Sequence, residues 1–106
     1  MKLRIQGDSI RIRISAKEAQ RIAEGSFVQE TTHFPGEKTL HYVLEPSLTS
    51  EVMHARFAND RVVVSLPMAL AVSWAKSEEV SLETTQTIPE DPSKSLYLLV
   101  EKDFDS

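Results

Sequence analysis

Residues 2–28, KLRIQGDSIRIRISAKEAQRIAEGSFV, align without a gap with residues 54–80, HARFANDRVVVSLPMALAVSWAKSEEV. Apolar residues, a turn and a helix follow one another in the same order in both stretches. Further along, 39–45 matches 95–101 after small insertions. We interpret the chain as one domain, 1–106, made of two tandem repeats, 1–52 and 53–106.

Each repeat begins with a predicted β-hairpin. In the first repeat, apolar residues alternate with basic ones on both sides of Gly7-Asp8, which is typical of half-buried strands joined by a tight turn. Asn59-Asp60 takes the place of that turn in the second repeat. Two further strands are expected in each repeat, near 27–33 with 39–45 and near 80–87 with 95–101.

A short helix is predicted between the two strand pairs of each repeat. Ser15 and Glu18 have the spacing of a capping box, and Gly25 is expected to end this helix at the C′ position. In the second repeat we expect Pro67 at the first helical position, where its missing N–H costs nothing. The order is therefore ββαββ, twice.

The predicted fold class is α+β and mostly β, with the duplicated ββαββ unit forming one pseudo-twofold barrel like that of swapped-hairpin proteins. Neither repeat could bury its strand faces alone, whereas two together could share a core. The residues expected in this core are Leu3, Ile5, Ile10, Ile12, Ile14, Ala19, Ile22, Phe57, Val62, Val64, Leu66, Ala71, Trp74, Val80, Leu82, Leu96 and Leu98.

Two family resemblances accompany this pattern. The segment 61–67, the helix after it and the strand near 80 resemble the AbrB/MazE swapped-hairpin module, and 8–28 resembles the same module with Ser15 in place of the proline. The resemblance implies a barrel of interleaved hairpins and a DNA-binding regulator. The whole chain also resembles a small uncharacterised bacterial family, through Met1–Ile5, Glu30–Phe34, Leu66-Pro67 and Val100–Phe104.

Composition narrows the functional classes. The 106 residues include no cysteine, which excludes a disulfide scaffold, a Cys-ligated metal and a thiol nucleophile. Apolar runs are too short to span a bilayer, and Met1-Lys2-Leu3-Arg4 does not look like a signal peptide, so we expect a cytoplasmic protein without membrane contact. Glycine-rich phosphate loops and nucleophile elbows are missing, so we predict a non-enzyme with no catalytic residues and no cofactor.

The apolar face of the second predicted helix is wider than that of the first, and the additional apolar residues suggest a docking surface. The second helix carries the apolar residues Met68, Leu70 and Val72. In the first helix, Glu18 is aligned with Leu70, and Gln20 is aligned with Val72. The leading hypothesis is a binding or regulatory module that contacts a protein partner, or a second copy, through these three residues. Cover by a neighbouring loop of the same chain is the alternative explanation.

A second hypothesis concerns the first hairpin, where Lys2, Arg4, Arg11 and Arg13 are expected on one face. Such a face could contact the phosphates of DNA, or it could be neutralised by carboxylates such as Glu30 or Glu45. The second repeat carries five basic against nine acidic residues and keeps only one of the four cations, as Arg56, which makes nucleic acid the less favoured partner.

A third hypothesis places a small molecule or a metal ion at the mouth of the barrel. His33 and His41 flank one loop, and a metal would need a third ligand such as Glu30 or Glu45. Ordinary surface histidines are the simpler interpretation, so no metal-ligating residue is assigned.

Overall fold

The computed structural model describes residues 1–103 and contains the ββαββ order twice. The ββαββ order predicted for each repeat is thereby confirmed, with strand ends shifted by a few residues. The elements are β1 (Lys2–Gln6), β2 (Ser9–Ser15), α1 (Ala16–Ala23), β3 (Val28–Phe34), β4 (Lys38–Ser47), β5 (His54–Ala58), β6 (Arg61–Pro67), α2 (Met68–Lys76), β7 (Ser81–Thr87) and β8 (Ser95–Asp103).

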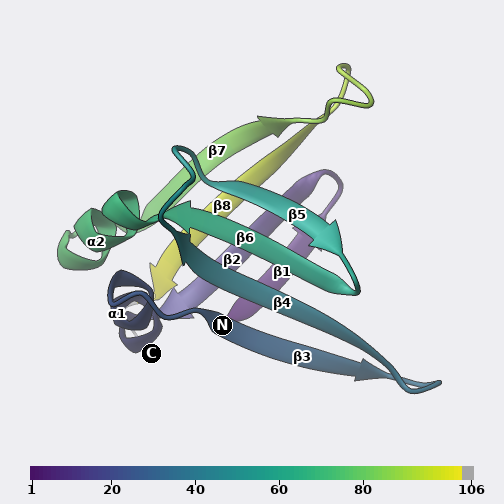
Figure 1. Ribbon diagram of the computed structural model, residues 1–106, viewed down its shortest axis with the longest axis horizontal. Helices are drawn as coiled ribbons and strands as arrows, with labels where there is room; N and C mark the ends of the chain where they lie inside the picture. The colour runs from purple at the N-terminus through teal and green to yellow at the C-terminus, as the bar shows by residue number, and fades with distance from the viewer. Residues whose placement is uncertain (104–106) are drawn as a thin grey trace.

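The repeats exchange hairpins to build two four-stranded sheets, ordered β1-β2-β8-β7 and β3-β4-β6-β5 (Figure 1). Each sheet thus takes one hairpin from each repeat. The central pairs, β2 with β8 and β4 with β6, are parallel, and the outer pairs are antiparallel. Because both central pairs join one repeat to the other, the repeats form a single folding unit.

The prediction of a barrel was wrong in one respect: the sheets do not close. Between β5 and β7, the backbone N–H of Ala55 donates to Gln86 Oε1 at 2.7 Å, and Gln86 Nε2 donates to the Ala55 carbonyl at 3.0 Å. Near β1 and β3, the Met1 ammonium lies 3.3 Å from a Glu30 carboxylate oxygen. Side chains therefore bridge the seams where a closed barrel would have a backbone ladder.

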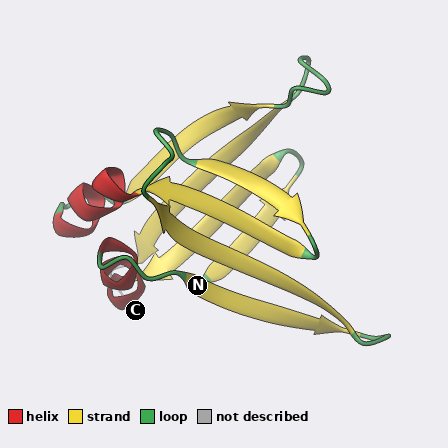
Figure 2. Cartoon of the chain, viewed as in Figure 1, coloured by secondary structure: helices red, strands yellow, loops and turns green. Residues whose placement is uncertain are grey.

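The core lies between the sheets and is closed at one end by the helices, which pack against each other there (Figure 2). Most of the predicted core residues are buried, among them Trp74, which is 1% exposed. The prediction also missed several buried residues: Val28, Val43, Leu44, Met53, Ala55, Val63 and Val100.

Three residues expected in the core are exposed instead: Ile5 by 56%, Phe57 by 69% and Val80 by 46%. Ile5 and Phe57 lie next to the hairpin turns, at the end of the sheets away from the helices, where strands extend beyond the packed interior (Figure 1). Val80 precedes β7 and lines an open groove described below. Leu3 and Leu96 are half-buried at the margin of the core.

The predicted local signals are largely present. Gly7, Asn59 and Asp60 have φ values of 54°, 53° and 60°, as tight hairpin turns require. In the capping box, the Glu18 N–H donates to Ser15 Oγ at 3.1 Å and the Ser15 N–H donates to Glu18 Oε1 at 3.0 Å. Pro67 differs from the prediction by one residue, because it is the N-cap of α2 and the last residue of β6.

The capping box also holds the chain's N-terminus. The Met1 ammonium lies 3.1 Å from a Glu18 carboxylate oxygen. Burial by itself raises the pKa of Glu18, but hydrogen bonds from Ser15 and the nearby Met1 ammonium outweigh it and lower that pKa below 4.5. The start of α1 is thus fixed by charge as well as by the cap.

Candidate functional site

The three residues proposed for docking on α2 have different environments. Leu70 is 39% exposed, whereas Met68 and Val72 are half-buried. Leu70 is also the one of the three that lines a groove. Cover by the chain itself is therefore incomplete, and Leu70 is the accessible member of the set.

The groove lies between α2, the loop before β5 and the start of β7, and has a volume of about 560 Å³. We call it the β7 groove; its lining residues are Glu51, Val52, Met53, Leu70, Glu79, Val80, Ser81, Leu82, Glu83 and Thr84. Val52 is 64% exposed and Val80 46%, so with Leu70 they present an apolar surface to solvent. A cluster of accessible apolar side chains in a concave site is typical of binding surfaces.

The charge of the β7 groove has one sign. Glu51, Glu79 and Glu83 line it, and no described Lys, Arg or His does. The Tyr97 hydroxyl donates to Glu83 on the outer face of the sheet, and this hydrogen bond raises the pKa of Tyr97 above 10.0. The groove is therefore apolar with an acidic rim, which favours a ligand that carries positive charge.

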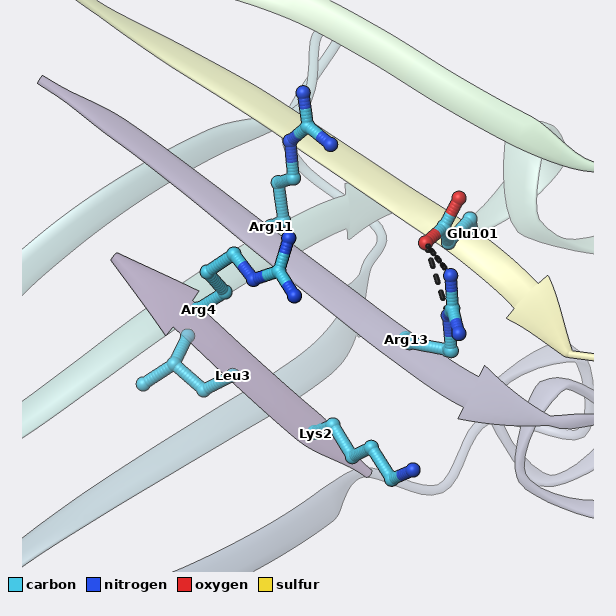
Figure 3. A pocket seen from close by; sticks show the side chains of 6 residues that line it. All are labelled: Lys2, Leu3, Arg4, Arg11, Arg13 and Glu101. Atoms are coloured by element: carbon cyan, nitrogen blue, oxygen red, sulfur yellow. Dashed lines mark hydrogen bonds and ion pairs between the residues drawn. The ribbon is translucent and has the colours of Figure 1, made fainter. Parts of the chain in front are cut away.

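The basic hairpin has the predicted geometry. Lys2 lies opposite Arg13 and Arg4 opposite Arg11, and all four side chains line one depression of about 440 Å³ on the outer face of their sheet (Figure 3). Arg13 Nη2 forms an ion pair with Glu101 at 3.0 Å. Glu101 was not predicted as a partner of Arg13, because β8 comes from the other end of the chain.

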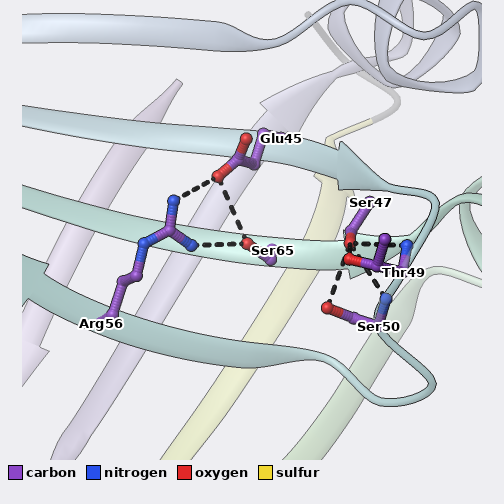
Figure 4. A network of polar contacts seen from close by, with 6 residues as sticks. All are labelled: Glu45, Ser47, Thr49, Ser50, Arg56 and Ser65. Atoms are coloured by element: carbon purple, nitrogen blue, oxygen red, sulfur yellow. Dashed lines mark hydrogen bonds and ion pairs between the residues drawn. The ribbon is translucent and has the colours of Figure 1, made fainter.

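The carboxylates that the sequence suggested as neutralising partners are engaged elsewhere. Glu30 lies near the Met1 ammonium, and Glu45 binds Arg56 Nη2 at 2.8 Å. Arg56 Nη1 also donates to Ser65 Oγ at 3.0 Å, next to a second polar cluster of Ser47, Thr49 and Ser50 (Figure 4). Glu45 and Glu101 are aligned between the repeats, so each pairs with an arginine of the other repeat.

One protein-family model matches the whole chain. The model for a family of unknown function, DUF7009, matches residues 1–106. The chain belongs to this family. No curated protein and no solved structure matches it. The match includes both repeats, and the predicted membership of an uncharacterised family is confirmed.

The described part of this DUF7009 chain contains no cluster of side chains that could bind a metal ion. Within residues 1–103, no three His, Asp or Glu side chains gather where an ion could be held. His41 Nδ1 instead lies 2.8 Å from the Thr31 hydroxyl. No described helix is long and apolar enough to cross a membrane.

Sequence reasoning identified Leu70 but not its neighbours in the groove. Val80 was assigned to the core, and Val52 lies in a connecting loop without a periodic pattern. Glu51 is distant in sequence from Glu79 and Glu83, and only the return of β7 beside the loop 48–53 brings the three together. An available signal was the acidic excess of the second repeat, which contributes Glu79 and Glu83.

Proposed function

We propose that this protein is a non-catalytic binding module of the bacterial cytoplasm whose β7 groove receives a segment of a partner protein. The observation that carries the proposal is the exposure of Val52, Leu70 and Val80 around one groove with an acidic rim. The cellular setting rests on the sequence resemblance and on the lack of cysteine.

Divergence between the repeats supports this role for Leu70. In α1 the third helical position holds Glu18, which completes the capping box. In α2 the same position holds Leu70, and the N-cap residue Pro67 makes no side-chain hydrogen bond to the helix. A carboxylate there would favour the helix N-terminus, so the partly exposed leucine offers the isolated fold less than a glutamate would. A leucine at this position is instead useful for contact with a partner.

A display experiment tests the proposal. Linear peptides on phage are selected on the immobilised protein, and the enriched peptides are then titrated against Leu70→Glu. We expect binding to weaken at least about tenfold, because the carboxylate removes apolar contact area and adds like charge to the rim. The variant should stay folded, since glutamate occupies the aligned position in α1.

Leu48→Glu is the matched control, because Leu48 is 90% exposed and does not line the groove. This variant should bind the enriched peptides as the unmodified protein does. Equal binding to Leu70→Glu, or no enrichment of any peptide, would contradict the proposal.

A second candidate function, contact with the phosphates of DNA, is favoured by the basic hairpin. Lys2, Arg4, Arg11 and Arg13 line one depression, and among the described residues only Arg13 of these four is in an ion pair. This cationic face lies on the same sheet as β7 but at the opposite edge. The AbrB/MazE resemblance suggests the same use, as a regulator.

Anisotropy of a labelled DNA duplex, titrated at about 50 mM salt and above, tests this second candidate. Replacing Arg11 and Arg13 together by serine should weaken binding and reduce the slope of log K against log salt by about 1.8, from two lost phosphate contacts. Arg21→Ser, which changes an exposed arginine on α1, should leave the slope unchanged. Lack of binding at the lowest salt would remove this candidate.

A further inference from the structure

We propose that the partner segment binds the β7 groove as an added β-strand along the edge of β7, and that it alternates basic and apolar residues. This inference rests on the proposed docking function and names its mode and the chemistry of the partner. β7 is an edge strand, with β8 as its one neighbour in the sheet. Edge strands carry backbone groups that can pair with another chain.

The register of β7 on β8 shows which backbone groups face the groove. The Lys102 N–H donates to the Val80 carbonyl at 2.8 Å, so Val80 points its backbone carbonyl toward β8. In an antiparallel pair these directions alternate from one residue to the next. Ser81 and Glu83 therefore direct their N–H and carbonyl groups away from β8, and both residues line the groove.

The edge is closed at its far end and open at its near end. Beyond Thr84, the Gln86 side chain occupies the backbone N–H and carbonyl of Ala55 and ties β7 to β5. Before that point the groove separates β7 from residues 51–53. An entering strand could thus pair with the stretch from Ser81 to Thr84 without displacing a backbone ladder.

The two faces of β7 define the side chains that such a strand needs. Leu82 is 8% exposed and faces the core side, where buried Met53 and part of Leu70 also line the groove. Glu83 points to the opposite, outer face, where it meets Tyr97. Because side chains alternate along a strand, an incoming segment would place apolar residues toward Leu82 and basic residues toward Glu83.

The chain itself contains one segment of this type, β1, which reads Lys2-Leu3-Arg4-Ile5-Gln6. A second copy that docked its β1 on β7 would extend the same sheet head to tail, since β1 and β7 are its two edges. Such a contact is heterologous and gives a ring or an open filament, whereas most homo-oligomers are twofold dimers with a self-complementary interface. We therefore assign the groove to a segment of a different protein, and self-association becomes an outcome of the test.

The probe is the synthetic peptide acetyl-(Lys-Val)₄-amide, with acetyl-(Glu-Val)₄-amide as its charge-reversed control. We expect the basic peptide to bind at least about tenfold more tightly than the acidic one. On binding, amide hydrogen exchange at Ser81 and Glu83 should slow, because their N–H groups become hydrogen-bonded. A ligand held through the apolar side chains alone would leave both amides unprotected.

Two variants of Glu83 distinguish the contribution of its backbone N–H to peptide binding from the contribution of its carboxylate charge. Glu83→Pro removes an outward N–H while keeping the β7–β8 ladder, as edge strands tolerate, and should weaken peptide binding at least about tenfold. Glu83→Gln keeps the N–H and should have a smaller effect. If the proline variant is unstable, protection of the Ser81 and Glu83 amides in the unmodified protein tests the same backbone pairing.

The outcomes distinguish strand addition from docking in general. If phage-selected peptides depend on Leu70 but neither protect the Ser81 and Glu83 amides nor respond to Glu83→Pro, strand addition is wrong and the docking function remains. If no peptide depends on Leu70, both fail. If sedimentation shows oligomers that Arg4→Glu and Glu83→Pro each dissolve, the occupant is a second copy and the assignment to another protein is overturned.

Discussion

Neither 1–52 nor 53–106 is expected to fold as an isolated monomer. A separated repeat would retain two hairpins and one short helix, but each of its hairpins would lose the central partner strand that the other repeat supplies through β2–β8 or β4–β6. Isolated two-stranded hairpins are at best marginally stable in water. Circular dichroism should therefore show a largely unfolded chain for either fragment.

An equimolar mixture of the two fragments is expected to regain the native sheets. The parallel pairing of β2 with β8 and of β4 with β6 needs no covalent link, and the joint at 52–53 lies in the loop between β4 and β5. Amide exchange should then protect the central strands in the mixture alone. A single fragment that unfolds cooperatively as a monomer would contradict the exchanged-hairpin topology as the basis of stability.

Local patterns in the sequence predicted most of the elements. Alternation marked β1 and β2, a capping box marked the start of α1, and turn residues placed both tight hairpins. These signals depend on neighbours within a few residues, so a single sequence contains them. The cross-strand pairs of the basic hairpin were predictable for the same reason.

Features that depend on distant segments were not predictable. Alternation assigns Ile5 and Phe57 to the core side of their strands, but it does not show that the sheets extend past the core at the hairpin turns. The open seam between β5 and β7 is bridged by Gln86 and Ala55, which lie 31 residues apart in the second repeat. The β7 groove likewise requires the loop 48–53 to lie beside β7.

Lys102 is a residue whose charge predicts exposure but whose position in the strand places it in the interior. It follows Leu98 and Val100 on the inner face of β8 and is 5% exposed. Its ammonium donates to the carbonyls of Trp74 at 2.6 Å and of Ser77 at 2.9 Å, at the C-terminal end of α2. The same ammonium lies 5.3 Å from the centre of the Trp74 ring. A cation here caps the helix end, which favours positive charge.

Lys102→Ala is expected to lower the free energy of unfolding by about 3 kcal/mol or more, since it leaves two helix-end carbonyls without this donor and removes packing on Trp74. Lys102→Met, which keeps most of the side-chain volume, should cost less than Lys102→Ala but still more than about 1 kcal/mol. Lys38→Met, at an exposed turn, should remain within about 0.5 kcal/mol of the unmodified protein. Urea titrations of the three variants measure these differences.

The pH dependence of the Lys102→Met deficit provides a second test of the buried ammonium. Burial lowers the pKa of Lys102 below 10.5, against a smaller opposing effect of Glu79. The unfolded chain therefore binds this proton more tightly, and the Lys102 contribution to the free energy of unfolding rises with pH from the folded pKa up to about 10.5. Lys102→Met removes that contribution, so its deficit should be larger near pH 10 than at pH 7. A deficit that is constant or shrinks over this range would show that burial does not lower the pKa of Lys102.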